Sequence, residues 1–261
     1  MGTKRKDIKY QLNKGYKLQT IMHYVNKETL IKQHDKQQEG KASGIDGVTK
    51  EEYGIYLEEN IENLLKRMKT FSYKPKPVKK TYIPKSNGKL RGLGIPCYED
   101  KLVQGAMAEV LNEIYENIFY DFSYGFRPKK NCHKAVSQIN WLIMTKKINY
   151  ILDADIKGFF DNIDHEILMM FLEHKIADKN FLRYIKRFLK AGVLEDYKYY
   201  ESDKGTPQGG VISPILANVY LHYVLDNWYK VVKKELKGEV YLIRYADDFV
   251  VMFQYEETAK K

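Results

Sequence analysis

The fold is decided by residues 240–253, which read Val240-Tyr241-Leu242-Ile243-Arg244-Tyr245-Ala246-Asp247-Asp248-Phe249-Val250-Val251-Met252-Phe253. Two runs of β-forming residues flank a pair of adjacent aspartates, which predicts a β-hairpin with two carboxylates at its tip. Neighbours along a straight strand point to opposite faces, so a turn is needed to aim both acids at one ion. A polar turn that happens to hold two aspartates is the simpler interpretation of these residues alone. The rest of the chain must decide.

The composition is that of an ordinary globular protein with an excess of positive charge. The 261 residues, 44% hydrophobic and 30% charged, can form one large core or two smaller ones. The net charge of +10 favours a polyanionic partner, although a biased base composition of the gene would produce the same excess. The sequence has neither an apolar signal region at its start nor an apolar run of membrane-spanning length. We therefore expect a soluble, cytoplasmic protein.

Cysteine and histidine usage argues against a zinc site. Cys97 and Cys132 stand far apart and form no Cys-x-x-Cys pair, which predicts reduced thiols. None of the six histidines has the spacing of a metal-binding motif. A metal site in this chain would have to use carboxylates.

Positive charge gathers in the first third of the chain. An apolar rhythm from Leu18 to Leu30 predicts an amphipathic helix, whose lysines are either solvated or in contact with RNA. Residues 66–91 contain ten lysines and arginines and no acid, which favours binding to nucleic acid. The candidate RNA-binding residues here are Lys66, Arg67, Lys69, Lys74, Lys76, Lys79 and Lys80.

Three further segments carry chemistry. Asn87-Gly88 predicts a hairpin between strands at 79–84 and 89–95 that presents Lys85 and Arg91 as cations for a triphosphate. Residues 150–156 predict a strand ending in acids, with Asp153 and Asp155 on one face. The glycine-rich loop at 205–210 precedes a buried helix, and its Gln208 is placed to reach a base or a sugar.

The order of these segments favours a metal site over a polar turn. A strand ending in acids, lying beside the aspartate hairpin, would bring Asp155, Asp247 and Asp248 together. Three carboxylates in one concavity suit two Mg²⁺ ions, one to activate a 3′-hydroxyl and one to neutralise the leaving pyrophosphate. The mixture of helices and strands predicts the α+β class.

At this point the chain resembles the reverse transcriptases encoded by group II introns, mobile genetic elements whose proteins also act as maturases in RNA splicing. The resemblance covers about residues 44 to 253. It rests on Tyr82-Ile83-Pro84-Lys85 through Ile95-Pro96, Tyr124-Gly125-Phe126-Arg127-Pro128, Asp155-Ile156-Lys157-Gly158-Phe159-Phe160-Asp161-Asn162-Ile163-Asp164-His165, Gly205-Thr206-Pro207-Gln208-Gly209-Gly210-Val211-Ile212-Ser213-Pro214-Ile215-Leu216-Ala217-Asn218 and Tyr245-Ala246-Asp247-Asp248.

The resemblance implies a right-hand polymerase that copies RNA into DNA from dNTPs on a DNA primer. By position, Asp155, Asp247 and Asp248 would be the catalytic metal ligands. Phe160 would be a steric gate against the ribose 2′-hydroxyl, and Lys85, Arg91 and Gln208 would contact the nucleotide. Arg127 would contact RNA, although a structural salt bridge is an equal alternative.

The resemblance also implies an architecture of fingers and palm, with a ferredoxin-like antiparallel palm sheet. We expect a basic extension and fingers over residues 1–145, and a palm over residues 146–261 that includes finger elements between about 171 and 203. Members of the family continue into a thumb, which this chain lacks, so weak processive synthesis is expected. The rival hypothesis is an RNA-binding splicing module with little polymerase activity. Monomer and dimer remain equal alternatives.

Overall fold

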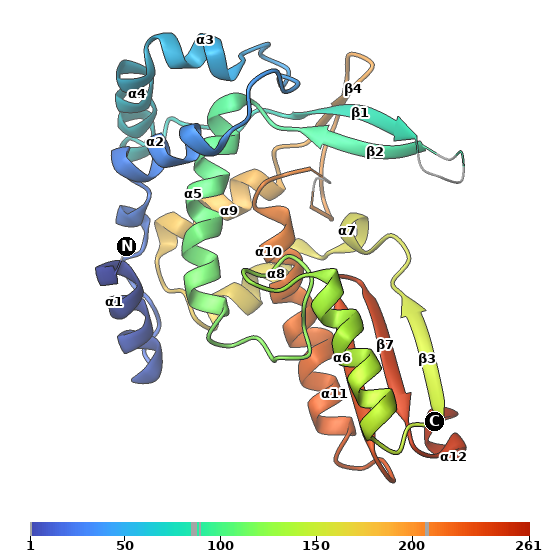
Figure 1. The fold of residues 1–261 in the computed structure, drawn as a ribbon. Helices are drawn as coiled ribbons and strands as arrows, with labels where there is room; N and C mark the ends of the chain where they lie inside the picture. The colour runs from blue at the N-terminus through green and yellow to red at the C-terminus, as the bar shows by residue number, and fades with distance from the viewer. Residues whose placement is uncertain (1, 85–87, 89, 207–208) are drawn as a thin grey trace. The chain divides into compact units, whose positions relative to one another are not determined.

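The computed structural model describes residues 2–84, 88, 90–206 and 209–261, with the side chains of residues 2–6 and 91 left aside (Figure 1). Contacts divide the chain into two compact units. Unit 1 comprises Met1–Ile114 and Phe160–Ser213, and unit 2 comprises Tyr115–Phe159 and Pro214–Lys261. This division differs from the predicted boundary at residue 145, because residues 115–145 belong with unit 2.

Unit 1 contains most of the helices. They are α1 (Gly2–Asn13), the 3₁₀ turn η1 (Met22–Tyr24), α2 (Lys27–Lys36), α3 (Lys50–Ile55), α4 (Leu57–Lys69), α5 (Tyr98–Tyr115), α7 (Phe159–Asn162), α8 (His165–Glu173) and α9 (Lys179–Leu189), with α5 and α7 running to the boundary. Local signals explain several starts. Thr49 and Glu52 form the predicted capping box of α3, and Asp164 and Asp178 cap α8 and α9.

The predicted helix over residues 18–30 is wrong. Leu18 instead pairs with Ile176 as an isolated parallel bridge, and its amide donates to the carbonyl of Lys175 at 2.8 Å. Asn26 then caps α2, where the helix begins. The apolar side chains at 18, 21 and 25 are buried as expected, but they reach the core from an isolated bridge and from the two ends of the 3₁₀ turn η1.

The sheet of unit 1 has the strand order β2-β1-β4-β5. Strands β1 (Val78–Pro84) and β2 (Leu90–Ile95) form the predicted antiparallel hairpin, with Lys79 opposite Ile95 and Ile83 opposite Arg91. A second hairpin, β4 (Val193–Glu195) and β5 (Lys198–Tyr200), joins it through parallel pairing of β1 with β4.

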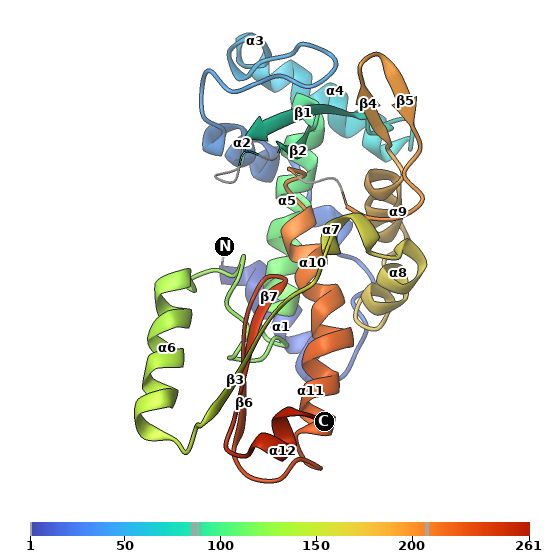
Figure 2. The same ribbon diagram turned by 90° about the vertical axis from the view of Figure 1, so that its right-hand side faces the viewer.

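Unit 2 is an antiparallel sheet with helices on both faces. Its strands are β3 (Tyr150–Asp155), β6 (Val240–Tyr245) and β7 (Asp248–Phe253), in the order β3-β7-β6. Leu142 of α6 (Cys132–Thr145) packs with Ile243 and Met252 on one face. On the other face Tyr229 packs with Val240, Leu242 and Phe253. Figure 2 shows α6 on one side of these strands and α11 on the other.

The helix on the second face has an irregular middle. It runs as α10 (Ser213–Leu221), the π-helical segment η2 (His222–Asp226) and α11 (Asn227–Val232), and the short α12 (Glu256–Ala259) follows β7. Both cysteine thiols are free, with Cys97 buried and Cys132 exposed. Across the described ranges, no helix combines the length and the apolar character needed to cross a bilayer.

Candidate active site

The aspartate hairpin has a two-residue turn. Strand β6 ends at Tyr245 and β7 begins at Asp248, so Ala246 and Asp247 form the connection. Ala246 has a φ of 58°, a left-handed conformation that residues other than glycine rarely adopt. The predicted hairpin is therefore present, but only one of the two aspartates, Asp247, lies in its turn. Asp248 is the first residue of β7, which fixes its direction by strand pairing.

Strand register brings the predicted acids together. Asp155 of β3 lies directly opposite Asp248 of β7, and Asp153 lies opposite Val250. Because side chains two residues apart share a face, Asp153, Asp155 and Asp248 lie on the same face of the sheet. All three are exposed and Asp247 is half-buried. The face therefore carries a group of carboxylates from two neighbouring strands and the turn, which we call the carboxylate face.

The neighbouring carboxylates affect the pKa of Asp248. Partial burial raises the pKa of Asp248, and the negative charges of Asp247, Asp155 and Asp153 raise it further. Like charges that face one another disfavour the ionised form of each, and a bound cation would remove that repulsion. A cation bound at the carboxylate face would therefore offset the repulsion between its carboxylates.

The donor set suits a hard divalent ion. Carboxylate oxygens are the ligands that Mg²⁺ prefers, and the face offers no thiolate or imidazole that would select a softer metal. Among the residues with described placement, no group of three or more His, Cys, Asp or Glu side chains already stands at metal-holding geometry. The chemistry of the face therefore fits Mg²⁺, although the side chains are not gathered around one point.

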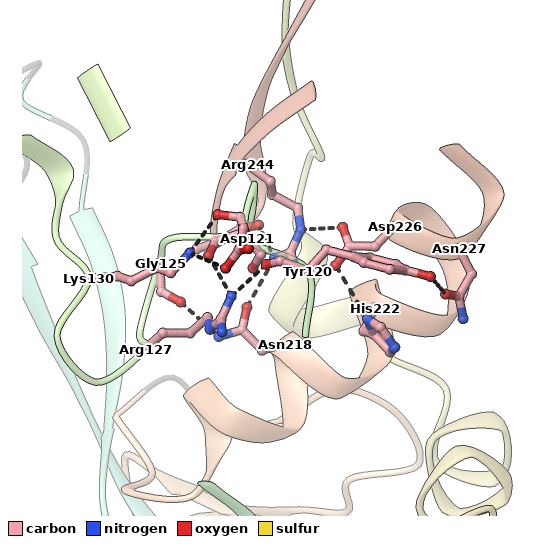
Figure 3. Close-up of polar contacts among 12 residues, drawn as sticks. Tyr120, Asp121, Gly125, Arg127, Lys130, Asn218, His222, Asp226, Asn227 and Arg244 are labelled. Carbon is pink, nitrogen blue, oxygen red and sulfur yellow. Dashed lines mark hydrogen bonds and ion pairs between the residues drawn. The ribbon is translucent and has the colours of Figure 1, made fainter. Parts of the chain in front are cut away.

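Behind the hairpin lies a buried polar cluster that the sequence analysis did not identify (Figure 3). Arg244 and Asp226 are each 0% exposed, and Asn218 is 1% exposed. The Arg244 guanidinium makes a two-pronged pair with Asp226, with Nε to Oδ1 at 2.8 Å and Nη2 to Oδ2 at 2.7 Å. The available signal was an arginine inside an otherwise apolar strand, because such a residue needs a buried partner.

The structure favours the structural alternative for Arg127 over its assignment to RNA. The side chain is 7% exposed and pairs with both carboxylate oxygens of Glu116, at 2.9 and 3.1 Å. Its Nη1 donates to the carbonyls of Tyr120 and Ser123, at 2.6 and 2.8 Å (Figure 3). A guanidinium held in this way stabilises the loop before α6, and Arg127 is therefore not proposed as an RNA contact.

The candidate nucleotide-binding residues belong to unit 1. Lys85 and Gln208 lie outside the described residues. Arg91 pairs through its backbone with Ile83, and its side chain also lies outside the described part. Phe160 is half-buried in α7, and its carbonyl accepts a hydrogen bond from the Thr206 amide at 2.7 Å. The assignment of these four residues to nucleotide binding therefore stays a prediction.

The basic segment divides into paired and unpaired cations. Three of its members make ion pairs inside unit 1: Arg67 with Glu99, Lys76 with Asp46 and Lys80 with Glu195. The side chains of Lys66, Lys69, Lys74 and Lys79 are exposed and make no ion pair within the described part of the chain. The sequence concealed this distinction, because the acids that neutralise the paired residues are distant along the chain.

Helix α9 adds basic residues that the sequence analysis missed. Its inner face buries six apolar and aromatic side chains, whereas Arg183, Lys186 and Lys190 are exposed on the outer face. The helix lies beside the end of α4, because the Tyr184 hydroxyl donates to the carbonyl of Met68 at 2.8 Å. The exposed bases of α9 thus adjoin those at the end of α4. We call Lys66, Lys69, Arg183, Lys186 and Lys190 the α4–α9 basic surface.

The antiparallel sheet, with aspartates on two adjacent strands and in the tight turn between β6 and β7, matches the predicted palm. The chain belongs to the reverse transcriptase family: the family model described as "Reverse transcriptase (RNA-dependent DNA polymerase)" matches residues 83–261.

Two of the similar curated proteins are bacterial, and one of them is encoded by a group II intron. The chain is 39% identical over 208 residues to the group II intron-encoded protein LtrA of Lactococcus lactis subsp. cremoris, covering 79% of this chain and 33% of that protein. It is 34% identical over 238 residues to protein YkfC of Escherichia coli K12, covering 80% and 62% respectively. The chain thus spans about a third of the length of LtrA.

Solved structures share the fold at low sequence identity. A partial Cas6-RT-Cas1–Cas2 complex matches with a TM-score of 0.54 and 16% identity, over 89% of this chain and 38% of that one. Telomerase from Candida albicans, solved with a fragment of telomeric RNA, matches with a TM-score of 0.54 and 14% identity, over 76% and 42%. These matches support the predicted α+β architecture of polymerase fingers and palm.

Proposed function

We propose that this chain is the RNA-directed DNA polymerase portion of a group II intron-encoded protein. Family membership supports the reaction class, and the pairing of Asp155 with Asp248 is the structural observation that carries the assignment of the site. In the reaction a primer 3′-hydroxyl attacks the α-phosphorus of a dNTP, and pyrophosphate leaves. When bound, two Mg²⁺ ions supply activation of the hydroxyl and neutralisation of the leaving group.

The residues of the chain position charge around that reaction. Asp155, Asp247 and Asp248 would hold the metal ions, and the rigid register of β3, β7 and β6 keeps their backbones in place. Lys85 and Arg91 would bind the triphosphate and Gln208 would line the nucleotide pocket. Phe160 would exclude a 2′-hydroxyl, because an aromatic ring fills the space and offers no acceptor.

Primer extension on an RNA template with dNTPs and Mg²⁺ tests the catalytic assignment. Asp247→Ala should abolish nucleotide incorporation, since it removes a metal ligand at the tip. Asp121→Ala is a matched control, because its side chain is a fully exposed carboxylate of unit 2 away from the carboxylate face. Incorporation that survives Asp247→Ala at the control's level would overturn the assignment.

We propose in addition that the chain binds intron RNA, as a maturase would. The α4–α9 basic surface supports this role, because it places exposed cations from two neighbouring helices side by side. The rival hypothesis, a splicing module with little polymerase activity, rests on the same surface. Residual incorporation in the primer-extension assay separates the two functions.

The salt dependence of RNA binding tests the basic surface. Replacing Lys66, Lys69 and Lys186 with glutamine should reduce the slope of log K against log salt by about 2, if all three contact phosphates of a single strand. The control replaces Lys234, Lys237 and Lys261, which are exposed in unit 2 and remove the same charge. Equal slopes for the two triple variants would show that the net charge, and not this surface, binds RNA.

A further inference from the structure

Arg244 reaches from the inside of the palm sheet to the turn that carries Asp247. Alternation along β6 places its side chain on the face opposite Asp248, so it is not a member of the carboxylate face. Its Nη1 donates to the carbonyl of Ala246 at 3.0 Å and to Oδ1 of Asn218 at 3.0 Å. One buried side chain thus connects the catalytic turn to the helix beneath it.

The turn needs external support because its backbone is strained. Ala246 occupies the left-handed region at φ 58°, which is sterically unfavourable for a residue with a Cβ. Such a conformation persists where neighbouring groups hold it. The loop before α6 supplies one contact, because Gly125 approaches so closely that an added Cβ would lie 2.2 Å from the Ala246 nitrogen. The hydrogen bond from Arg244 supplies a second contact.

The far end of Arg244 is fixed by the irregular helix. Asp226 is the last residue of the π-helical segment η2, and it accepts both prongs of the guanidinium. Asn218, one helical segment earlier, accepts from Nη1 and donates through Nδ2 to the carbonyl of Gly125 at 2.8 Å (Figure 3). The same cluster therefore holds the turn and the glycine loop that presses on it.

The charge of Arg244 is already neutralised. Burial alone would raise the pKa of Asp226, but the hydrogen-bonded guanidinium of Arg244 and the nearby His222 ring, whose Nδ1 is 3.8 Å from Oδ2, lower it below the ordinary value, so the carboxylate stays ionised beside the guanidinium. A neutral pair at this depth contributes little field to the carboxylate face. What the arginine contributes is direction, because its planar fork donates to acceptor atoms of three residues at once.

We propose that Arg244 is a positioning residue of the active site: through its hydrogen bond to the Ala246 carbonyl, and anchored by Asp226 and Asn218, it sets the conformation of the turn that presents Asp247. The inference rests on the proposed function, because it assigns the turn a metal to hold. It also makes a claim about the turn itself, which can be measured without metal or substrate.

A second interpretation is that the pair only fills the core. Buried ion pairs of this kind contribute specificity or stability in some proteins and can be replaced by apolar residues in others. In that case loss of Arg244 would weaken unit 2 as a whole and leave the turn no more affected than the rest of the sheet. The experiment must therefore compare the turn with the unit that contains it.

The variants are Arg244→Lys, Asn218→Ala and Tyr229→Phe, each made in the full chain. Arg244→Lys keeps the charge next to Asp226 but removes the planar fork. Asn218→Ala is the milder second variant, in case Arg244→Lys does not fold. Tyr229→Phe is the control, because it removes a buried hydrogen bond of unit 2, from the Tyr229 hydroxyl to the carbonyl of Val240, at the end of β6 that lies away from the turn.

The first readout is amide hydrogen exchange of the peptide covering residues 240–253, without metal. Arg244→Lys and Asn218→Ala should accelerate exchange at the turn at least tenfold, whereas Tyr229→Phe should leave it within twofold of the original chain. Unchanged exchange in folded Arg244→Lys, or in Asn218→Ala if the former does not fold, would overturn the proposal. Equal acceleration at the turn in Tyr229→Phe would also overturn it, in favour of a general loss of core packing.

The second readout is Mn²⁺ binding, followed by electron paramagnetic resonance. We expect the Asp247-dependent affinity to fall about tenfold in Arg244→Lys and to persist in Tyr229→Phe. Affinity unchanged in a folded Arg244→Lys chain would overturn the link between turn and metal. If the original chain shows no Mn²⁺ binding that Asp247→Ala removes, the proposed function fails instead, and the exchange measurement alone decides the role of Arg244.

Discussion

Replacing Asp248 with asparagine should stabilise the metal-free chain. Asp248 faces Asp155 across an antiparallel pair, and its pKa is raised by burial and by three neighbouring carboxylates. Opposed side chains in such a pair lie about 5 Å apart. At that distance and at the high effective dielectric of an exposed site, each repulsion amounts to roughly 1 kcal/mol before screening. Salt at physiological strength reduces it, so we expect a net gain of about 1 kcal/mol.

The sign should reverse when a divalent ion is present. An ion that binds only the folded state stabilises it by about 1.4 kcal/mol at ten times its dissociation constant. The original chain should gain this stability from Mg²⁺, and Asp248→Asn should gain less because one ligand has lost its charge. The expected result is a crossing: the variant is more stable without Mg²⁺ and the original chain is more stable with it.

Urea unfolding at low salt, with and without Mg²⁺, measures the crossing. Glu235→Gln serves as the control, since it removes one exposed carboxylate of the same unit without relieving the carboxylate face. The pH dependence gives an internal check. A carboxyl whose folded pKa is raised costs stability as pH rises through that pKa, so the advantage of the variant should be full at neutral pH and vanish below about pH 3.9. A variant that is less stable without metal at neutral pH would refute the reasoning.

Three other substitutions probe different parts of the chain. Gly125→Ala should cost unit 2 at least about 2 kcal/mol in urea unfolding and abolish incorporation, because the new Cβ meets the Ala246 backbone at 2.2 Å; a stable, active variant would contradict the contact. Burial tends to raise the pKa of Glu109, but hydrogen bonds from two lysines and a glutamine lower it to about 2. A depressed carboxyl pKa gives stability that is present above about pH 4.3 and lost on acidification. Glu109→Gln should therefore lower the free energy of unfolding by about 1 to 2 kcal/mol at pH 7 and have almost no effect near pH 2. Parallel curves of unfolding free energy against pH for the two chains would exclude this pairing. Phe160→Ala should reduce the preference for dNTP over rNTP, measured as the ratio of kcat/KM values, by about 10- to 100-fold, and an unchanged ratio would remove Phe160 from the gate.

The sequence predicted the carboxylate face because its logic is local. Strand propensity and the adjacent aspartates gave the hairpin, and the alternation of residues gave the shared face of Asp153 and Asp155. It could not say that the tip holds Asp247 alone. That detail depends on a strained φ at Ala246, which no propensity favours and which contacts from residues 125 and 244 hold in place.

The other misses arise from tertiary contacts. The predicted helix over residues 18–30 failed because Leu18 found a bridge partner at Ile176, more than 150 residues away. The uninterrupted basic segment concealed three ion pairs for the same reason, since Glu99, Asp46 and Glu195 lie outside it. Sequence patterns within a window report the preferences of that window, and they carry no information about distant partners that override them.

The π-helical segment η2 makes length a constraint on this palm. Asn218 on one side of it is committed to Gly125 and Arg244, and on the other side the Tyr229 hydroxyl donates to the carbonyl of Val240 at 2.9 Å. A π turn holds more residues than an α turn, so it takes up an additional residue between these anchors without turning either of them away from its partner. One more residue inserted into the α-helical part would turn one anchor away by about 100°. Insertions there are therefore expected to be more damaging than substitutions at exposed positions such as Val224. In this stretch the number of residues is therefore constrained separately from their chemical identity.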